Sequence, residues 1–260
     1  MLRRTQNPDG GWGYFPGKQS WLEPTAYAAL ATGSESAVRC LKSWQLPGGG
    51  FRPSSEVRGA TWVTALAVLA GNSSGVRWLL ETSGRESRWT VRLFSYFGLL
   101  KSGVNVNHRG WPWRPQTSAW VEPTALAVLA LKKTASARSN PRIQEGQEWI
   151  LSRRDRDGGW NCGNPNVLNY DSPSYPETTA LALIGLQGRA QSELAGPIEV
   201  ARTYYQGCKS PLAKAWLTIA LRCHGHLLPP PGDSPPPRDT LICTLEALGH
   251  PAGNWKAFQV

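Results

Sequence analysis

The feature that most constrains the fold of this 260-residue chain is a unit that occurs four times. Each copy starts with an aromatic anchor directly after a glycine, continues through a polar loop, and ends in an Ala/Leu-rich run that begins near a threonine. The anchors are Trp12, Phe51, Trp111 and Trp160, and the threonines are Thr25, Thr64, Thr124 and Thr179. The anchors recur on average about every 49 residues, a spacing typical of stacked helical pairs.

The distance from anchor to threonine is 13 residues in the first three copies and 19 in the fourth, whose loop over 161–176 carries an insertion. Because the Ala/Leu-rich runs are apolar on every side, they predict buried inner helices, which we expect at 22–32, 62–70, 122–132 and 177–187. Amphipathic segments between them predict outer helices at 36–45, 75–82 and 141–153. A further apolar stripe over 89–101 is expected to begin another turn of the ring.

The C-terminal part repeats less clearly. Segments 212–223 and 239–249 predict two more inner helices, which brings the inner candidates to six. Hairpins closed into a ring bury the ends that an open solenoid exposes. The sequence therefore predicts an all-α fold, an α/α toroid built as a closed ring of five or six helical hairpins. We expect one domain over 1–260, with clear repeats in 6–187, degenerate repeats in 196–260 and a Pro-rich loop at 228–238.

The charge and the cysteines limit the partners and the compartment. A formal charge of +10 favours an anionic partner such as a phospholipid surface or a diphosphate. No nucleic-acid-binding module is recognisable, so nucleic acid is not an expected partner. The five cysteines follow no disulfide spacing, which suits a reducing compartment. Without a signal-like segment or a membrane-spanning apolar run, the chain is expected to be cytoplasmic, with peripheral membrane contact as an alternative.

A short motif precedes each anchor. Gln6 to Trp12 reads Gln-x-x-x-Gly-x-Trp, and Gln45 to Phe51 differs only in its ring. Asn105 to Trp111 and Arg154 to Trp160 keep the ring and lose the glutamine. This pattern resembles the QW repeat of squalene–hopene cyclases, oxidosqualene cyclases and protein prenyltransferase β subunits. The resemblance implies an α/α toroid in which the glutamine amide and the tryptophan ring tie the ends of outer helices to the neighbouring loop.

The acid of those cyclases lies in an Asp-x-Asp-Asp motif that directly precedes Thr-Ala. Alignment on Thr-Ala places Trp120, Glu122 and Pro123 on the three aspartate positions of the third copy. The first and fourth copies place Glu23 and Glu177 at the position of Glu122. A single glutamate thus replaces the aspartates in three copies. Two interpretations stay open: helix-start caps, which a carboxylate there can provide, or an acid.

The inserted loop of the fourth copy is long and polar, and such loops often carry function. It places Tyr170, Asp171 and Tyr175 close in sequence to Glu177. As candidate catalytic residues we therefore take Glu177, Glu122 and Asp171. We expect a single cavity opening near this loop. The candidate substrate-binding residues come from all four copies: Trp21, Glu23, Trp62, Trp120, Tyr170 and Tyr175.

A zinc site like that of protein prenyltransferases would need an aspartate, a cysteine and a histidine. Cys223, His226, Asp239 and Cys243 have suitable types, but they follow none of the recognised spacings. We therefore expect neither a metal nor another cofactor.

Three functions follow from these observations. The first is a terpenoid-cyclase-like or isoprenoid-binding toroid with an aromatic-lined central cavity, lacking the Asp-x-Asp-Asp acid motif; as an enzyme it would be a cyclase-like isomerase or lyase, or a prenyltransferase-like transferase. The second is a non-catalytic toroid that binds a lipid or a protein. The third is a carbohydrate-active toroid that uses paired glutamates. The expected ligand is an isoprenoid or lipid-like small molecule, and the oligomeric state stays open.

Overall fold

The computed structural model describes residues 2–97, 106–164, 166–167, 170–229 and 239–260. Its inner helices, named for their place in the ring, are α1 (Leu22–Thr32), α3 (Val63–Leu69), α6 (Val121–Lys133), α8 (Pro176–Gly185), α10 (Pro211–Cys223) and α11 (Thr240–Gly249). The outer helices are α2 (Glu35–Ser43), α4 (Val76–Glu81), α7 (Pro141–Leu151) and α9 (Gln191–Gly207). The remaining elements are α5 (Trp89–Tyr96), the 3-10 helices η1 (Leu2–Arg4), η2 (Ser73–Gly75), η3 (Arg85–Ser87) and η4 (Trp255–Phe258), and the strands β1 (Asn166–Val167) and β2 (Tyr170–Asp171).

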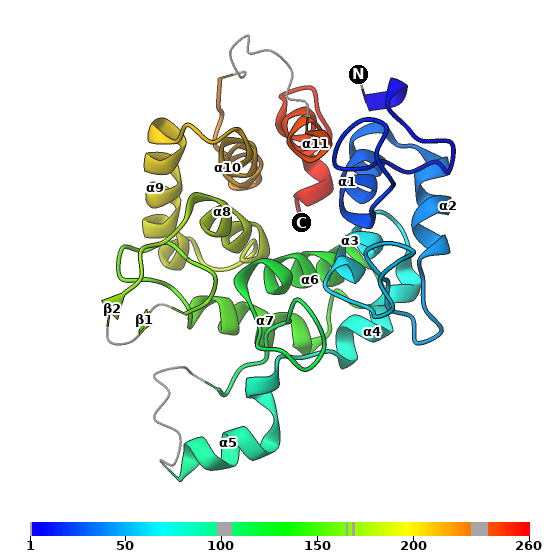
Figure 1. Cartoon of the computed structure of the whole chain (residues 1–260). Helices are drawn as coiled ribbons and strands as arrows, with labels where there is room; N and C mark the ends of the chain where they lie inside the picture. The colour runs from blue at the N-terminus through cyan, green and yellow to red at the C-terminus, as the bar shows by residue number, and fades with distance from the viewer. Residues whose placement is uncertain (1, 98–105, 165, 168–169, 230–238) are drawn as a thin grey trace.

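The inner helices form a closed ring. Each packs on the next in the order α1, α3, α6, α8, α10, α11, and α11 packs back on α1 (Figure 1). The outer helices pack against the outside: α2 on α1, α4 on α3, α7 on α6, and α9 on both α8 and α10. The predicted all-α toroid is therefore confirmed, with six inner helices in the described part of the chain. The described residues also include one short antiparallel strand pair, β1 with β2, which lies in the inserted loop and was not predicted.

The constant spacing within the repeat has a physical cause. The backbone N–H of each anchor donates to the hydroxyl of the threonine in the following inner helix, at 2.9–3.0 Å in all four copies. These threonines are fully buried, so the hydroxyl satisfies a donor that water cannot reach. Each bond holds a loop at the start of an inner helix.

The indole rings bind the outer layer. Trp111 Nε1 donates to the carbonyl of Leu79 near the end of α4, and Trp160 Nε1 donates to that of Ile150 near the end of α7. Trp12 Nε1 donates to Leu2 in η1. Carbonyls in the last turn of a helix lack helical partners, so each indole supplies one. The anchors thus occupy equivalent buried positions.

The glutamine of the motif also binds its loop. Gln6 Nε2 donates to the carbonyl of Gly10 at 2.7 Å, and Gln45 Nε2 donates to that of Gly49 at 3.4 Å. Asn105, at this position in the third copy, lies outside the described residues. There the buried guanidinium of Arg142, in α7, donates to the equivalent carbonyl of Arg109.

Arg142 also lies 3.5 Å from the centre of the Trp111 ring. The ring face attracts the cation, and the carbonyls of Thr82 and Gly110 accept further hydrogen bonds from the same guanidinium. A residue 33 positions downstream of the loop therefore binds it in the third copy.

The C-terminal segment crosses the end of the ring at which the inner helices finish. Phe258 is fully buried and packs against the rings of Tyr27 in α1 and Trp216 in α10. Its carbonyl accepts from Gln187, just after α8, and Lys133 at the end of α6 donates to the carbonyl of Gln259. Aromatic rings therefore fill this half of the ring. The C-terminus lies near the ring centre in Figure 1.

The expectation that 89–101 begins another turn of the ring is wrong for its described part. Helix α5 projects from the ring in Figure 1, and Trp89, Tyr96 and Phe97 are largely exposed. The end of that segment, like most of the predicted Pro-rich loop, lies outside the described residues. In the described part of the chain, no helix combines the length and the hydrophobicity that a membrane span requires.

Candidate functional site

Three carboxyl groups converge at the end of the ring where the inner helices begin. Glu23, Glu122 and Glu177 are each the second residue of their helix, in α1, α6 and α8. Each helix starts after an aromatic residue with extended backbone, respectively Trp21, Trp120 and Tyr175. Repeat symmetry therefore carries the carboxyls to one face. We call this set of three carboxyls the carboxylate mouth; Trp62, directly before α3, occupies the equivalent position in the second copy.

The electrostatics of the carboxylate mouth single out Glu122. Burial, reinforced by the charges of Glu23 and Glu177, raises its pKa to about 8. Burial also raises the pKa of Glu23, and the charge of Asp239 acts in the same direction. The Tyr14 hydroxyl opposes this by donating to the Glu23 carboxylate at 2.5 Å. Glu122 therefore keeps its proton at neutral pH.

Capping hydrogen bonds do not account for these glutamates. In the described part of the chain, none of the three carboxylates accepts a hydrogen bond from a helix N–H, and Glu23 binds the Tyr14 hydroxyl instead. By contrast, side chains that do cap are evident at α2, α7, α10 and α11. The capping interpretation therefore has no hydrogen bond among the described residues to support it, and it stays a prediction that rests on the helix dipole alone.

Tyr27 extends the mouth into the ring. Its side chain is fully buried, and its hydroxyl has no hydrogen-bond partner among the described residues. The nearby charges of Glu23 and Glu122 add to burial in raising its pKa, so the hydroxyl stays protonated. A protonated hydroxyl of this kind can donate a hydrogen bond but does not release its proton near neutral pH.

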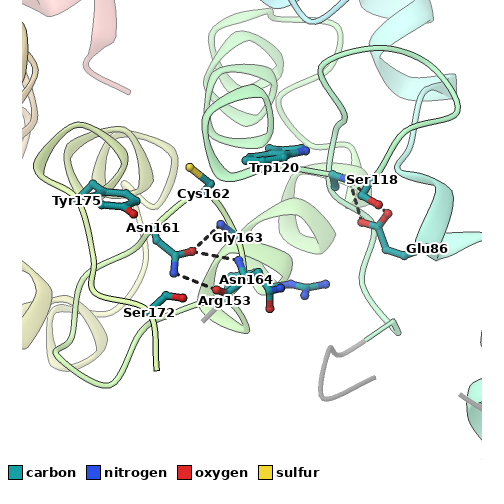
Figure 2. A pocket seen from close by; sticks show the side chains of 11 residues that line it. Glu86, Ser118, Trp120, Arg153, Asn161, Cys162, Gly163, Asn164, Ser172 and Tyr175 are labelled. Atoms are coloured by element: carbon teal, nitrogen blue, oxygen red, sulfur yellow. Dashed lines mark hydrogen bonds between the residues drawn. The ribbon is translucent and has the colours of Figure 1, made fainter. Parts of the chain in front are cut away.

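A pocket of about 490 Å³ opens between the loops of the third and fourth copies, and Glu122 is not among its lining residues. Figure 2 shows Trp120 and Tyr175 on either side of Cys162. Both rings remain 39% and 47% exposed, so a ligand can reach them. Burial raises the pKa of the Cys162 thiol, and the charges of Glu122 and Asp155 act in the same direction. We call this the side pocket; its other lining residues are Glu86, Ser118, Ala119, Arg153, Asn161, Gly163, Asn164 and Ser172.

The polar wall of the side pocket is held by hydrogen bonds. The Asn161 side chain accepts from the backbone of Gly163 and Asn164 (Figure 2). It also donates to the carboxylate of Asp155 at 3.0 Å. On the opposite side, the Glu86 carboxylate accepts from the backbone N–H of Ala119. Burial raises the pKa of Asp155 to about 6.

The structure brings some of the predicted site residues together and not others. Trp120 and Tyr175 line the side pocket, whereas Trp21, Trp62 and the three glutamates Glu23, Glu122 and Glu177 lie outside its lining. Trp21 contacts Tyr14, and Trp62 packs edge-on against Trp113 at 4.7 Å.

In β2, Asp171 is exposed and forms an ion pair with Arg156 at 2.5 Å. It does not line the side pocket. The side chain of Tyr170 lies outside the described residues.

Sequence reasoning missed Tyr14, Tyr27, Glu86 and Arg153. Tyr14 lies in the first loop, two residues after Trp12, and the repeat pattern gives no signal for individual loop residues. Tyr27 stands in an Ala-rich run and resembles any other core residue. Glu86 and Arg153 reach the side pocket from the connections after α4 and α7, so only packing reveals their position.

Within the described residues, no group of three or more His, Cys, Asp or Glu side chains is arranged to hold a metal. Asp239 caps α11 by accepting from the N–H of Ile242, and burial raises the pKa of Cys223 to about 12. Of the residues whose types suggested zinc, Asp239 thus serves as a helix cap and Cys223 is a buried thiol.

No protein family model matches the chain. It is similar to the drimenyl diphosphate synthase of Streptomyces showdoensis, with 29% identity over 193 residues, which cover 69% of this chain and 35% of that enzyme. It is also similar to a probable squalene–hopene cyclase of Sinorhizobium fredii, with 30% identity over 78 residues, 28% of this chain and 12% of the relative. These relatives are terpene synthases and cyclases, and the matched regions span about a third or less of their length.

Solved structures of the type II terpene cyclase MstE from Scytonema also match. The apo form has a TM-score of 0.48 and 16% identity, covering 95% of this chain and 78% of that one. A complex of the same cyclase with its substrate geranylgeranyl dihydroxybenzoate has a TM-score of 0.48 and 16% identity, covering 99% and 79%.

Proposed function

We propose that this chain is a terpenoid-cyclase-like toroid that binds an isoprenoid in the side pocket and protonates one of its double bonds from Glu122. The observation that carries the proposal is the buried Glu122, whose raised pKa keeps its proton at neutral pH and which follows by two residues Trp120, a ring that lines the side pocket. The similarity to terpene cyclases supports the substrate class. Because the matched regions cover only 35% and 12% of those relatives, activity and substrate are both proposals for this chain.

The reaction needs a carboxyl that carries its proton at neutral pH. In the proposed step, the π electrons of the double bond take the proton from the Glu122 carboxyl. One carbon gains a C–H bond, the other becomes a cation, and Glu122 becomes a carboxylate. Attack by a second double bond forms the new C–C bond, and loss of a proton to a carboxylate of the mouth ends the sequence. Atoms and charge balance without a cofactor.

A carboxyl with a raised pKa holds its proton firmly, so the cation itself must be stabilised. Two features of the site support this. The accessible faces of Trp120 and Tyr175 present the negative side of their ring quadrupoles to the pocket. The neighbouring carboxyls Glu23 and Glu177 also favour positive charge, and the low polarity around Glu122 strengthens that attraction.

A second candidate is an isoprenoid-binding toroid without turnover. It is favoured by the surroundings of Glu122, whose carboxyl has no hydrogen-bond donor among the described residues to stabilise the carboxylate left after proton transfer. The carbohydrate hypothesis has less support, because the side pocket is mainly apolar and its walls include two aromatic rings.

The experiment incubates the protein with geranyl, farnesyl and geranylgeranyl diphosphate and with squalene in D₂O, followed by mass spectrometry. Protonation from a solvent-exchanged carboxyl predicts one deuterium in the cyclic product. Glu122→Gln keeps the shape and removes the proton, so turnover should fall by about 10²-fold or more while ligand binding persists. Glu35→Gln, at an exposed carboxyl in α2, is the matched control and should leave turnover unchanged.

The outcomes separate the candidates. Ligand binding without product by the wild-type protein supports the second candidate. A product free of deuterium, or one formed equally by Glu122→Gln, refutes Glu122 as the acid. Absence of both binding and product refutes the isoprenoid assignment.

A further inference from the structure

Helix α5 presents an apolar stripe to solvent. Trp89, Leu93, Tyr96 and Phe97 follow the i, i+4, i+7, i+8 spacing of one helix face, and Phe94 adjoins it. Trp89 is 74% exposed, Tyr96 85% and Phe97 64%, whereas an amphipathic helix of a globular protein normally buries such a stripe. Its main packing partner in the ring is the short η3 that precedes it.

We propose that this α5 face docks on a lipid surface that carries anionic head groups. The side chains are of the kind that settles at a membrane interface, where an aromatic ring sits among the acyl chains and a polar tip remains in water. The exposed Arg85 and Arg88 flank the start of the helix, and the whole chain carries a charge of +10. Both the face and its border therefore complement an anionic bilayer.

The size of the face argues against a second copy of the chain as its occupant. An eight-residue helix is about 12 Å long, so its apolar face is far smaller than the roughly 800 Å² per partner that a stable interface buries. A bilayer needs no complementary shape, and a few aromatic rings suffice for reversible binding when basic residues contribute.

The position of α5 also suits a protein with an apolar ligand. Glu86 lines the side pocket, and Trp89 begins α5 only three residues later. Docking through α5 would bring the pocket close to the lipid, from which an isoprenoid can be taken. The docking proposal stands independently of the proposed chemistry, since membrane binding is measured without substrate.

The test is vesicle flotation of the full chain with phosphatidylcholine alone and with phosphatidylcholine mixed with phosphatidylserine. The wild-type protein should float with the mixed vesicles. Trp89→Ser with Phe97→Ser should weaken that partition about tenfold or more, because two large apolar side chains no longer enter the lipid. Arg85→Gln with Arg88→Gln should weaken binding to the mixed vesicles, and more so at low salt.

The matched control is Phe15→Ser with Leu227→Ser, which removes two exposed apolar side chains elsewhere and should leave flotation unchanged. Thermal unfolding checks that both double variants fold, and single Trp89→Ser and Phe97→Ser replace a double variant that does not. The proposal is overturned if the wild-type protein floats with neither vesicle, or if α5 and control variants float equally. Self-association in sedimentation velocity that the α5 variant alone abolishes, without flotation, would assign the face to a second copy instead.

Discussion

The protonation of Glu122 predicts a specific dependence of stability on pH. Its pKa is about 8 in the folded chain and 4.5 for an unperturbed glutamate. Below pH 4.5 the carboxyl is protonated in both states and contributes no pH dependence. Between these values the unfolded chain releases the proton while the folded chain retains it, so raising the pH destabilises the fold. The full penalty is reached above about pH 8.

The magnitude follows from the same two values. Each tenfold change in proton affinity corresponds to about 1.4 kcal/mol, so the largest penalty is about 5 kcal/mol. Glu122 retains some contact with solvent at the mouth, and screening there reduces the effect. We therefore expect Glu122→Gln, which is neutral at every pH, to be more stable than the wild-type protein by about 1–3 kcal/mol at pH 9. Near pH 5 the difference should shrink to below about 1 kcal/mol.

Urea denaturation followed by circular dichroism at a series of pH values from 5 to 9 measures this difference. Glu35→Gln controls for the loss of one negative charge at an exposed site. If the difference in unfolding free energy between Glu122→Gln and the wild-type protein stays constant across that range, the surroundings of Glu122 do not raise its pKa. The acid role proposed for it would then lose its basis.

Two further predictions concern the repeat. Trp111→Ala should destabilise the fold by about 3–5 kcal/mol in a denaturant titration, since it removes a buried ring stacked on Arg142. Trp89→Ala, at an exposed ring, should change the unfolding free energy by less than about 0.5 kcal/mol. Equal effects of the two variants would contradict the assignment of Trp111 as an anchor. Thr124→Ala should lower the unfolding free energy by about 1–3 kcal/mol because the buried N–H of Trp111 loses its acceptor. Thr124→Ser keeps the hydroxyl and should retain most of the stability. A Thr124→Ser variant as unstable as Thr124→Ala would mean that the methyl group, not the hydrogen bond, stabilises the fold.

Much of the ring could be predicted from the sequence because its signals are local. A helix that is apolar all round needs only its own residues to be recognised, and the structure places α1 at the predicted 22–32 and α6 within a residue of 122–132. The loop-to-helix hydrogen bond imposes a fixed chain length between anchor and threonine, and so it leaves a visible spacing. The repeated glutamate was likewise found by alignment of the copies.

The state of that glutamate was not predictable from the same alignment. Glu23, Glu122 and Glu177 occupy one repeat position, yet Glu23 accepts a hydrogen bond from Tyr14 while Glu122 is buried between two like charges. Desolvation and charge at a site depend on neighbours that the fold brings from distant parts of the chain. The local pattern alone left both a cap and an acid open.

By itself, the sequence determined the repeat, the type of its helices and the closure of the ring, because periodicity and spacing are properties of short segments. The tertiary structure decided the rest. It placed Arg142 where a motif glutamine is missing, filled one half of the ring with Phe258, and left α5 outside the ring although its stripe resembles a core face. The reason is that an apolar stripe states only that a helix can bury one face, whereas the available partner surfaces are set by how the other helices have already packed.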